Sequence, residues 1–462
     1  MLKLSNSSFF NIFLIFLGSI FLVPFFALMV KAENFDSIIE WQKSFGGSEP
    51  DSASSITITS DGGYLIAGYS ESNNGDATAN RGNRDYWIVK IDALGNIQWQ
   101  KSLGGSGWDY AHSSQQTFDG GYIIAGESKS NDGDVIRNPR SNENCSIDNC
   151  NSDYWIVKLD SQGNIQWQKS LGGSGEDIAK SIKTTSDGGY IIAGDSDSND
   201  GDVTGNHGKI DYWIVKLDSH GNMLWQKSLG GSLWDYANAI KITLDGGYII
   251  AGDSSSNDGD VKGNHGGRDY WIVKIDSQGE IKWQKSFGGR GLESARDIQQ
   301  TFDSGFIIVG ESSSNERDLT VNKGNYDAWI VKVDSLGTLQ WQKSLGGSEG
   351  DYAISCQIST DGGYMIVGYS ESNDGDIKDN YGKVDYWIVK LDSQGTLQWQ
   401  QSFGGSDWDE PSSIQITSDG GYIIAGGSLS NDGDVTLNFG YSDYWIVKLR
   451  NIVNTMTSQS IM

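Results

Sequence analysis

The chain has 462 residues, and 34 basic against 60 acidic residues give it a formal net charge of −26. This acidic balance argues against nucleic acids and anionic membrane surfaces as partners, because both attract Lys and Arg. The chain has only three cysteines, which are too few for a fold held together by a framework of disulfides.

Residues 1–32 are predicted to be an export signal. Lys3 provides a short basic start, residues 9–30 are almost wholly apolar, and Val30-Lys31-Ala32 offers a small-x-small cleavage site. An apolar run of about 22 residues could also span a bilayer as an uncleaved membrane anchor. In either case we expect the rest of the chain outside the cytoplasmic membrane, secreted or in the cell envelope.

Two short motifs recur seven times after this segment. Successive copies are 58 residues apart, except for a single gap of 68. A fixed period of this size is typical of a repeat architecture, in which each unit buries its apolar faces against its neighbours. The first motif is Trp-Gln, with its tryptophan at positions 41, 99, 167, 225, 283, 341 and 399. The second has the form Asp-Tyr-Trp-Ile-Val-Lys, with its tryptophan at positions 87, 155, 213, 271, 329, 387 and 445.

One repeat predicts four short strands, at residues 177–185, 190–194, 211–217 and 223–229. The Asp-Gly turn between the first two is a strong hairpin signal. The second and third strands are apolar on both faces, so their sheet must be covered on both sides. Four-stranded sheets stacked face to face in a ring meet this demand. We therefore predict an all-β fold, a seven-bladed β-propeller of antiparallel blades over residues 33–450, with a short tail at 451–462.

The two ends of the repeat region are complementary. The first copy begins with a lone fourth strand at residues 38–45, and the last copy ends after its third strand at residues 444–449. Pairing these two strands would close the ring and remove two exposed edges. We expect the closed ring to be a monomer.

The motifs Trp-Gln-Lys-Ser-Leu-Gly-Gly-Ser, Ser-Asp-Gly-Gly-Tyr-Ile-Ile-Ala-Gly and Asp-Tyr-Trp-Ile-Val-Lys-Leu-Asp resemble those of secreted bacterial β-propeller repeat proteins, over the whole region 36–450. The resemblance implies export and the propeller fold. The segment from Leu159 to Trp167 is also similar to the tryptophan-docking turn of quinoprotein-type propellers. That likeness implies that Trp99, Trp167, Trp225, Trp283, Trp341 and Trp399 pack between blades.

An acidic residue stands ten positions after each Trp-Gln tryptophan, where the first strand of a blade begins. In a propeller this strand lines the central channel, so the acids are expected as a ring near the upper face, which carries the loops before the first strand and after the second. Such a ring could bind a cation, or each acid could accept backbone N–H groups at a blade junction. The seven acids are Asp51, Asp109, Asp177, Asp235, Glu293, Asp351 and Asp409.

The loop after the second strand repeats Ser-Asn-x-Gly-Asp-x-x-x-Asn. Clustered Asn and Asp oxygens suit Ca²⁺, a hard cation, although the spacing is not that of an EF-hand. Asx-turns explain the same composition without metal. Calcium is thus the one cofactor that the sequence suggests, with Asp76, Asp134, Asp202, Asp260, Asp376 and Asp434 as candidate ligands.

Tryptophan occupies one position of the loop before the first strand in blades 2, 4 and 7, whereas the other blades carry Pro, Glu, Leu or Gly. Exposed indole rings beside carboxylates would suit a sugar face or a cationic group. Alternatively, these rings cover the loops beneath them. The candidate ligand-binding residues are Trp108, Trp234, Trp408, Asp109, Asp235 and Asp409.

Cys145 and Cys150 lie together in the insertion near residues 139–150 that causes the gap of 68. In an oxidising compartment they could form a disulfide within that loop. Cys356 replaces an isoleucine of other repeats and is expected to be buried.

No catalytic motif stands out, because the four histidines are scattered and lack a distinctive nucleophile or acid beside them. We therefore predict an exported, non-enzymatic β-propeller that acts as a binding or surface scaffold for an extracellular glycan, protein or cation. The alternatives are a glycan-active or quinone-dependent propeller enzyme and a purely structural cell-envelope protein.

Overall fold

The computed structural model describes residues 38–136, 151–319 and 321–451. The predicted export signal and the predicted Cys145–Cys150 disulfide lie outside these residues. The chain divides into two units, Met1–Ser37 and Ile38–Met462, and all described residues belong to the second. Among them, no helix is long and apolar enough to cross a membrane.

The described residues form 28 strands. The inner strands are β2 (Asp51–Ile58), β6 (Asp109–Gln116), β10 (Asp177–Thr184), β14 (Asp235–Ile242), β18 (Glu293–Gln300), β22 (Asp351–Ile358) and β26 (Asp409–Ile416). The second strands are β3 (Tyr64–Ser70), β7 (Tyr122–Ser128), β11 (Tyr190–Ser196), β15 (Tyr248–Ser254), β19 (Phe306–Ser312), β23 (Tyr364–Ser370) and β27 (Tyr422–Ser428).

The third strands are β4 (Asp85–Ile91), β8 (Asp153–Leu159), β12 (Asp211–Leu217), β16 (Asp269–Ile275), β20 (Asp327–Val333), β24 (Asp385–Leu391) and β28 (Asp443–Leu449). The outer strands are β5 (Ile97–Leu103), β9 (Ile165–Leu171), β13 (Met223–Leu229), β17 (Ile281–Phe287), β21 (Leu339–Leu345), β25 (Leu397–Phe403) and β1 (Ile39–Phe45).

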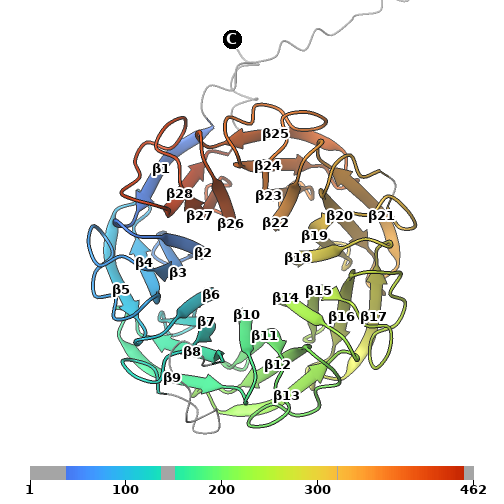
Figure 1. The fold of residues 1–462 in the computed structure, drawn as a ribbon, viewed down its shortest axis with the longest axis horizontal. Helices are drawn as coiled ribbons and strands as arrows, with labels where there is room; N and C mark the ends of the chain where they lie inside the picture. The colour runs from blue at the N-terminus through green and yellow to red at the C-terminus, as the bar shows by residue number, and fades with distance from the viewer. Residues whose placement is uncertain (1–37, 137–150, 320, 452–462) are drawn as a thin grey trace, which may run out of the picture. The chain divides into compact units, whose positions relative to one another are not determined.

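These strands form seven antiparallel sheets of four strands, which are the blades of a β-propeller around a central channel (Figure 1). Blades 1 to 6 each consist of four strands that are consecutive in sequence. Blade 7 has the order β1-β28-β27-β26, with Phe45 opposite Tyr444. The predicted all-β seven-bladed propeller and its closure by the N-terminal strand are thus confirmed.

The two repeated motifs hold each blade together and join it to the next. The indole Nε1 of Trp87 donates to Gln100 Oε1 of the adjacent outer strand at 3.0 Å. The hydroxyl of Tyr86 donates to the carbonyl oxygen of Trp155 in the next blade at 2.9 Å. Because both side chains are fully buried, these hydrogen bonds satisfy polar groups that burial would otherwise leave unpaired.

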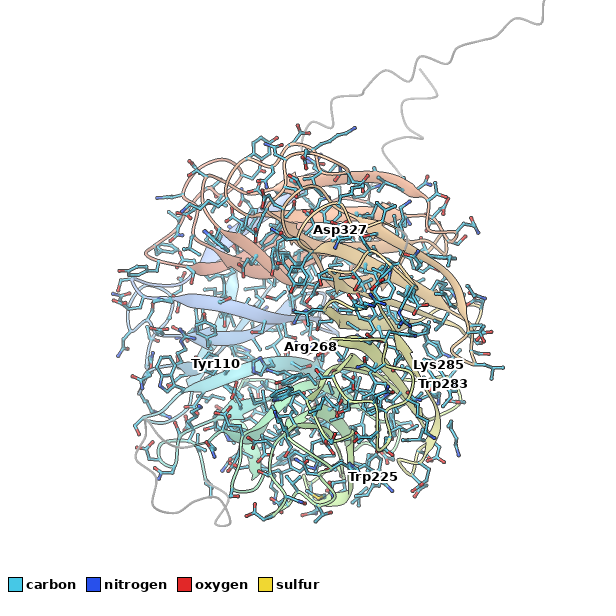
Figure 2. The ribbon with its side chains drawn as sticks, turned by 45° about the vertical axis from the view of Figure 1, so that its right-hand side comes forward. Tyr110, Trp225, Arg268, Trp283, Lys285 and Asp327 are labelled. Atoms are coloured by element: carbon cyan, nitrogen blue, oxygen red, sulfur yellow. The ribbon has the colours of Figure 1, made fainter. Side chains whose placement is uncertain are left out.

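The outer-strand tryptophans pack between blades. Trp283 lies on β17 beside Lys285 (Figure 2), and both side chains cover Gly337 in the turn between β20 and β21. A Cβ at Gly337 would come 3.0 Å from the Trp283 ring, so only glycine permits this contact. The ring also lies 6.0 Å, between centroids, from Phe306 of the next blade.

A β-bulge in every inner strand determines which side chains reach the channel. In β6 the register against β7 shifts between Ala111 and Ser113. His112 lines the channel above the shift, whereas Gln115 and Gln116 line it below. The inner strand therefore does not present one simple alternation of residues to the channel.

Candidate functional site

The inner-strand acids are buried at the blade junctions and do not form an open ring. Asp109 has 0% exposure. Its Oδ2 accepts hydrogen bonds from Gly105 N at 2.9 Å and from Ser130 Oγ at 2.8 Å, and its Oδ1 accepts one from Ser128 Oγ. The other six acids are equally buried. Of the two interpretations of these acids, the hydrogen bonds agree with the second, in which each acid accepts backbone N–H groups at a blade junction. An open ring of carboxylates on the channel wall is not formed, because each carboxylate turns into its own loop.

Asp109, Asp235 and Asp409 would need their loops to open before they could touch a ligand directly, since none has exposed surface. Burial raises the pKa of Asp109 to about 6. Asp85 of the preceding blade lies across Gly104 from it, and burial followed by the charge of Asp109 raises the pKa of Asp85 to about 7. Such a pair is a property of every blade junction, which points to a structural role for these acids.

The candidate calcium ligands lie in loops whose aspartate oxygens already accept hydrogen bonds from backbone N–H groups. Asp134 Oδ2 accepts a hydrogen bond from Gly104 N at 3.3 Å, and Asp132 Oδ1 accepts one from Ser106 N at 2.7 Å. Within the described ranges, no group of three His, Cys, Asp or Glu side chains is placed to hold a metal ion. Calcium binding by these aspartates remains a prediction.

The three non-repeated tryptophans all lie on the upper face, but their surroundings differ. The Arg84 guanidinium lies 4.9 Å from the Trp108 ring centroid, and Lys209 Nζ lies 3.5 Å from that of Trp234. Cations of the protein therefore already contact two of these rings. Trp234 and Trp408 are almost equally exposed, at 40% and 41%. Trp408 differs in having no cation of the described residues against its ring.

A cavity of about 300 Å³ lies beside Trp408, between blades 7 and 1. Its lining includes Tyr69, Glu410, Leu429 and the backbone of Gly427. Gly427 pairs with Glu410 across the blade. At the same register position the other blades carry Tyr69, Glu127, Asp195, Asp253, Glu311 and Tyr369. We call this cavity the blade 7 pocket. The equivalent junction between blades 5 and 6 also holds a cavity, of about 280 Å³, but its lining includes the side chains of Glu311 and Arg296. Gly427 therefore distinguishes the blade 7 pocket by the absence of a charged or aromatic side chain at this position.

The blade 7 pocket combines apolar faces with polar groups. Trp408, Tyr69 and Leu429 supply apolar surface, whereas Glu410 and the Ser52 and Ser442 hydroxyls supply hydrogen-bonding groups. Burial and the nearby charge of Glu371 raise the pKa of Glu410. This arrangement can hold a flat apolar face together with a hydroxyl or ammonium donor.

Contacts between basic and acidic side chains occupy the same level of the channel mouth in blades 2, 4 and 5. Arg296 Nε lies 3.0 Å from Glu311 Oε2, and Arg268 Nε lies 3.2 Å from Asp253 Oδ2. His112 Nε2 lies 3.3 Å from Glu127 Oε1. Figure 2 labels Arg268 of blade 4 and, for orientation, Tyr110 of blade 2. The cavity of about 280 Å³ in this arc is lined by Arg268, Arg296 and Glu311. This arc thus carries charged groups, whereas the blade 7 pocket offers the Trp408 ring and the backbone of Gly427.

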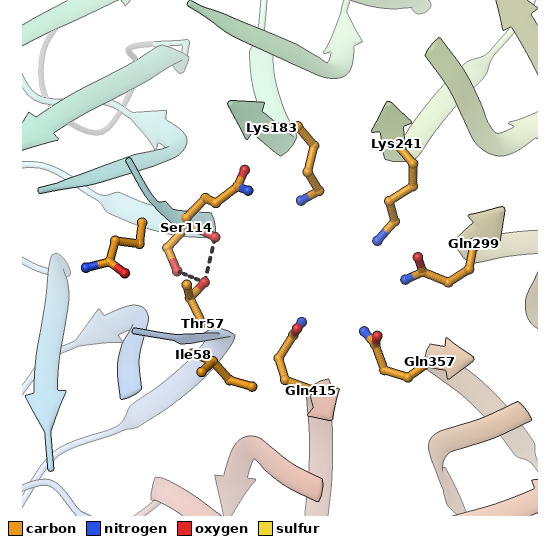
Figure 3. Close-up of a pocket in the computed structure, with 10 residues that line it drawn as sticks. Thr57, Ile58, Ser114, Lys183, Lys241, Gln299, Gln357 and Gln415 are labelled. Carbon is orange, nitrogen blue, oxygen red and sulfur yellow. Dashed lines mark hydrogen bonds between the residues drawn. The ribbon is translucent and has the colours of Figure 1, made fainter. Parts of the chain in front are cut away.

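A second cavity, of about 470 Å³, occupies the channel near the lower turns. It is lined by one side chain from each inner strand, six positions after the buried acid (Figure 3). These side chains are Thr57, Gln115, Lys183, Lys241, Gln299, Gln357 and Gln415.

Neither of these two cavities was expected from the loops, where residues that differ between blades drew attention to the tryptophans. In the inner and second strands, the residues that differ between blades include Gly427, Lys183 and Lys241.

No family model matches the chain. The regulatory protein FlaEY of Caulobacter vibrioides is 25% identical over 241 residues, which make up 46% of this chain and 24% of FlaEY. The chain therefore spans about a quarter of the length of this relative.

Three solved structures are similar to the chain. A protein of unknown function from Bacteroides caccae has a TM-score of 0.36 and 12% identity, covering 66% of this chain and 93% of its own. Sqt1 from Chaetomium thermophilum has a TM-score of 0.43 and 9% identity, covering 89% and 100%. YCF48 bound to D1 peptide has a TM-score of 0.43 and 10% identity, covering 88% and 96%. At these values none of the three indicates a ligand or an activity for this chain.

Proposed function

We propose that this protein is an exported, non-enzymatic binding protein that holds part of its ligand in the blade 7 pocket. The observation that carries the proposal is the combination, in one pocket, of the exposed Trp408 ring with Gly427, where the other blades carry an acidic residue or a tyrosine. Selective binding requires residues that differ between blades, because seven equivalent sites would not form one distinctive pocket. Export is supported by the sequence of residues 1–32.

The ligand should present a flat apolar face together with hydrogen-bond donors. A sugar unit of a glycan has this form, and so does a basic side chain of a protein. Both can lie against an indole ring while a carboxylate accepts their hydroxyl or ammonium hydrogens. One such contact contributes roughly 0.5–2 kcal/mol, so high affinity would need additional contacts on the upper face or a multivalent ligand.

Glycan and peptide arrays probed with the purified protein and with Gly427→Tyr test this function. Tyrosine fits the backbone at this position, since Tyr69 and Tyr369 stand at the same register in blades 1 and 6. We expect the variant to keep the wild-type melting temperature and to lose at least tenfold in affinity for the ligand of the wild-type protein. Glycan hits and basic-peptide hits separate the two ligand classes.

Tryptophan variants provide matched controls. Trp408→Ala should weaken binding as strongly as Gly427→Tyr. Trp234→Ala should leave binding unchanged, because Lys209 already covers that ring. If both blade 7 variants bind the ligand like the wild-type protein, the blade 7 pocket is not the binding site.

A further inference from the structure

The lower channel cavity has a charge pattern that the rest of this acidic protein does not predict. Lys183 and Lys241 come from the neighbouring inner strands β10 and β14, and both ammonium groups point into the shared space (Figure 3). The five other members of this ring are uncharged: one threonine and four glutamines. The amide ends of Gln299, Gln357 and Gln415 point into the same space.

The two lysines are not equally neutralised. Lys241 Nζ lies 3.0 Å from Asp297 Oδ1. Asp297 is itself buried and also accepts hydrogen bonds from Cys356 N at 3.1 Å and Ser355 Oγ at 3.2 Å. Lys183 Nζ donates to the carbonyl oxygen of Ile182 at 2.9 Å and has no ion-pair partner among the described carboxylates.

This part of the channel therefore contains two amino groups and one carboxylate, and it carries an excess of one positive charge when both amino groups are protonated. Burial, and then the charge of Lys241, lowers the pKa of Lys183 to about 7, although its side chain keeps some exposure to the channel. A partly buried charge without a counter-ion is unfavourable. An anion between the lysines would remove this penalty and form charge-assisted hydrogen bonds with both ammonium groups.

We propose that the lower end of the channel binds a small oxyanion, such as a phosphate, a sulfate or the carboxylate of an organic acid, between Lys183 and Lys241. Each ammonium group has three N–H donors and each glutamine amide has two. Gln299 and Gln357 each use one on a backbone carbonyl oxygen, of Cys356 and Ile414. The remaining N–H donors of the ring can face an oxyanion. The volume of about 470 Å³ also leaves room for an organic group attached to the anion. This site is separate from the blade 7 pocket, which lies at the opposite face of the propeller.

Isothermal titration calorimetry and thermal melting with phosphate, sulfate and citrate test the site, with chloride used to keep ionic strength constant. We expect at least one oxyanion to bind with measurable heat and to raise the melting temperature with concentration, because a ligand of the native state stabilises it. The anion that binds most tightly identifies the group that the site prefers.

Lys183→Gln is the decisive variant. Glutamine stands at the equivalent position in four blades, and the change breaks no ion pair of Lys183, so the fold should be kept. We expect its oxyanion affinity to fall at least tenfold. The control is Lys227→Gln, which removes a lysine of the outer strand β13 that forms an ion pair with Glu280. This variant should bind the oxyanion like the wild-type protein. If none of the three oxyanions binds, or if Lys183→Gln binds as tightly as the wild-type protein, the proposal is wrong.

Discussion

Each blade junction buries two carboxyl groups close together. In the junction between blades 1 and 2, Gly104 lies between Asp85 and Asp109, so that a Cβ there would be 2.6 Å and 2.5 Å from their oxygens. Burial raises the pKa of both, to about 7 and about 6. At neutral pH the folded state thus holds protons that the unfolded chain, with pKa values near 3.8, would release.

This arrangement predicts that stability decreases as pH rises. A carboxyl group whose folded pKa is raised contributes most stability below its unfolded pKa, and that contribution is lost as pH rises through its folded pKa. We expect the melting temperature to fall between about pH 4 and pH 7, the window between these unfolded and folded pKa values. Asp85→Asn, which cannot ionise, should reduce the fall. Thermal melting of the wild-type protein and of Asp85→Asn across this pH range measures the fall. A melting temperature that rises with pH in both proteins would contradict the raised pKa values of these carboxyl groups.

The elements of the propeller are joined by the same few contacts in every blade, with one exception. In six blades a tyrosine hydroxyl donates a hydrogen bond to the carbonyl oxygen of a tryptophan in the next blade. Tyr212 donates in this way to Trp271 at 2.9 Å. Blade 5 carries Ala328 at this position and lacks the contact to Trp387. The interface between blades 5 and 6 is therefore formed without this hydrogen bond.

Removing one of these hydroxyls should cost about 1 kcal/mol, because a buried hydrogen bond between two blades is lost. Tyr212→Phe is the direct variant, measured by denaturant unfolding. Tyr248→Phe is the matched control, since the Tyr248 hydroxyl has no hydrogen-bond partner among the described residues. Equal stability of Tyr212→Phe and the wild-type protein would show that this contact does not stabilise the ring.

Strand β1 closes the ring, and its removal should open it. Gln42 Oε1 accepts a hydrogen bond from Trp445 Nε1 at 2.6 Å, and Phe45 is buried against blade 1. Deleting residues 33–46 would expose the edge of β28 and this apolar surface. We expect a markedly lower melting temperature and association through the exposed edge, detected by light scattering. Deletion of 452–462, beyond the last strand, serves as the control, and an equally stable monomer after the first deletion would contradict closure by β1.

The strands and their closure could be predicted because each depends on a local signal repeated seven times: Asp-Gly turns, apolar runs and complementary ends. The junction role of the acids could also be anticipated, but not their serine partners, because the hydroxyls that bind Asp109 come from the end of β7 and the loop after it, 19 and 21 residues away. The channel lining could not be predicted, because the bulge after Ala111 changes which side chains face inward. The chemistry of the blade 7 pocket depends on Gly427, which in sequence is only one irregular position.

Across the whole molecule, the residues that repeat in every blade and the residues that differ between blades lie in different regions. The repeated residues lie at blade junctions, where each contact recurs around the ring. The varied residues lie at the channel mouth and in the channel, where they give the two faces different chemistry. The upper face carries the blade 7 pocket, and the lower channel carries two lysines.

The calcium hypothesis also concerns the whole ring, because its candidate loops recur in every blade. If the loops bind Ca²⁺, adding a chelator should lower the melting temperature, and Asp260→Asn should reduce that effect. Calorimetry with Ca²⁺ measures the same binding directly. Identical melting with and without chelator would leave the hydrogen-bonded turns as the full explanation of these aspartates.

The most direct test of binding at the blade 7 pocket is hydrogen–deuterium exchange of the wild-type protein with and without the ligand found on the arrays. We predict that the ligand slows exchange in residues 405–411 and 427–442, around Trp408 and Gly427, and leaves the turns of the lower face unchanged. Protection confined to the lower turns, with no change around Trp408, would contradict this function.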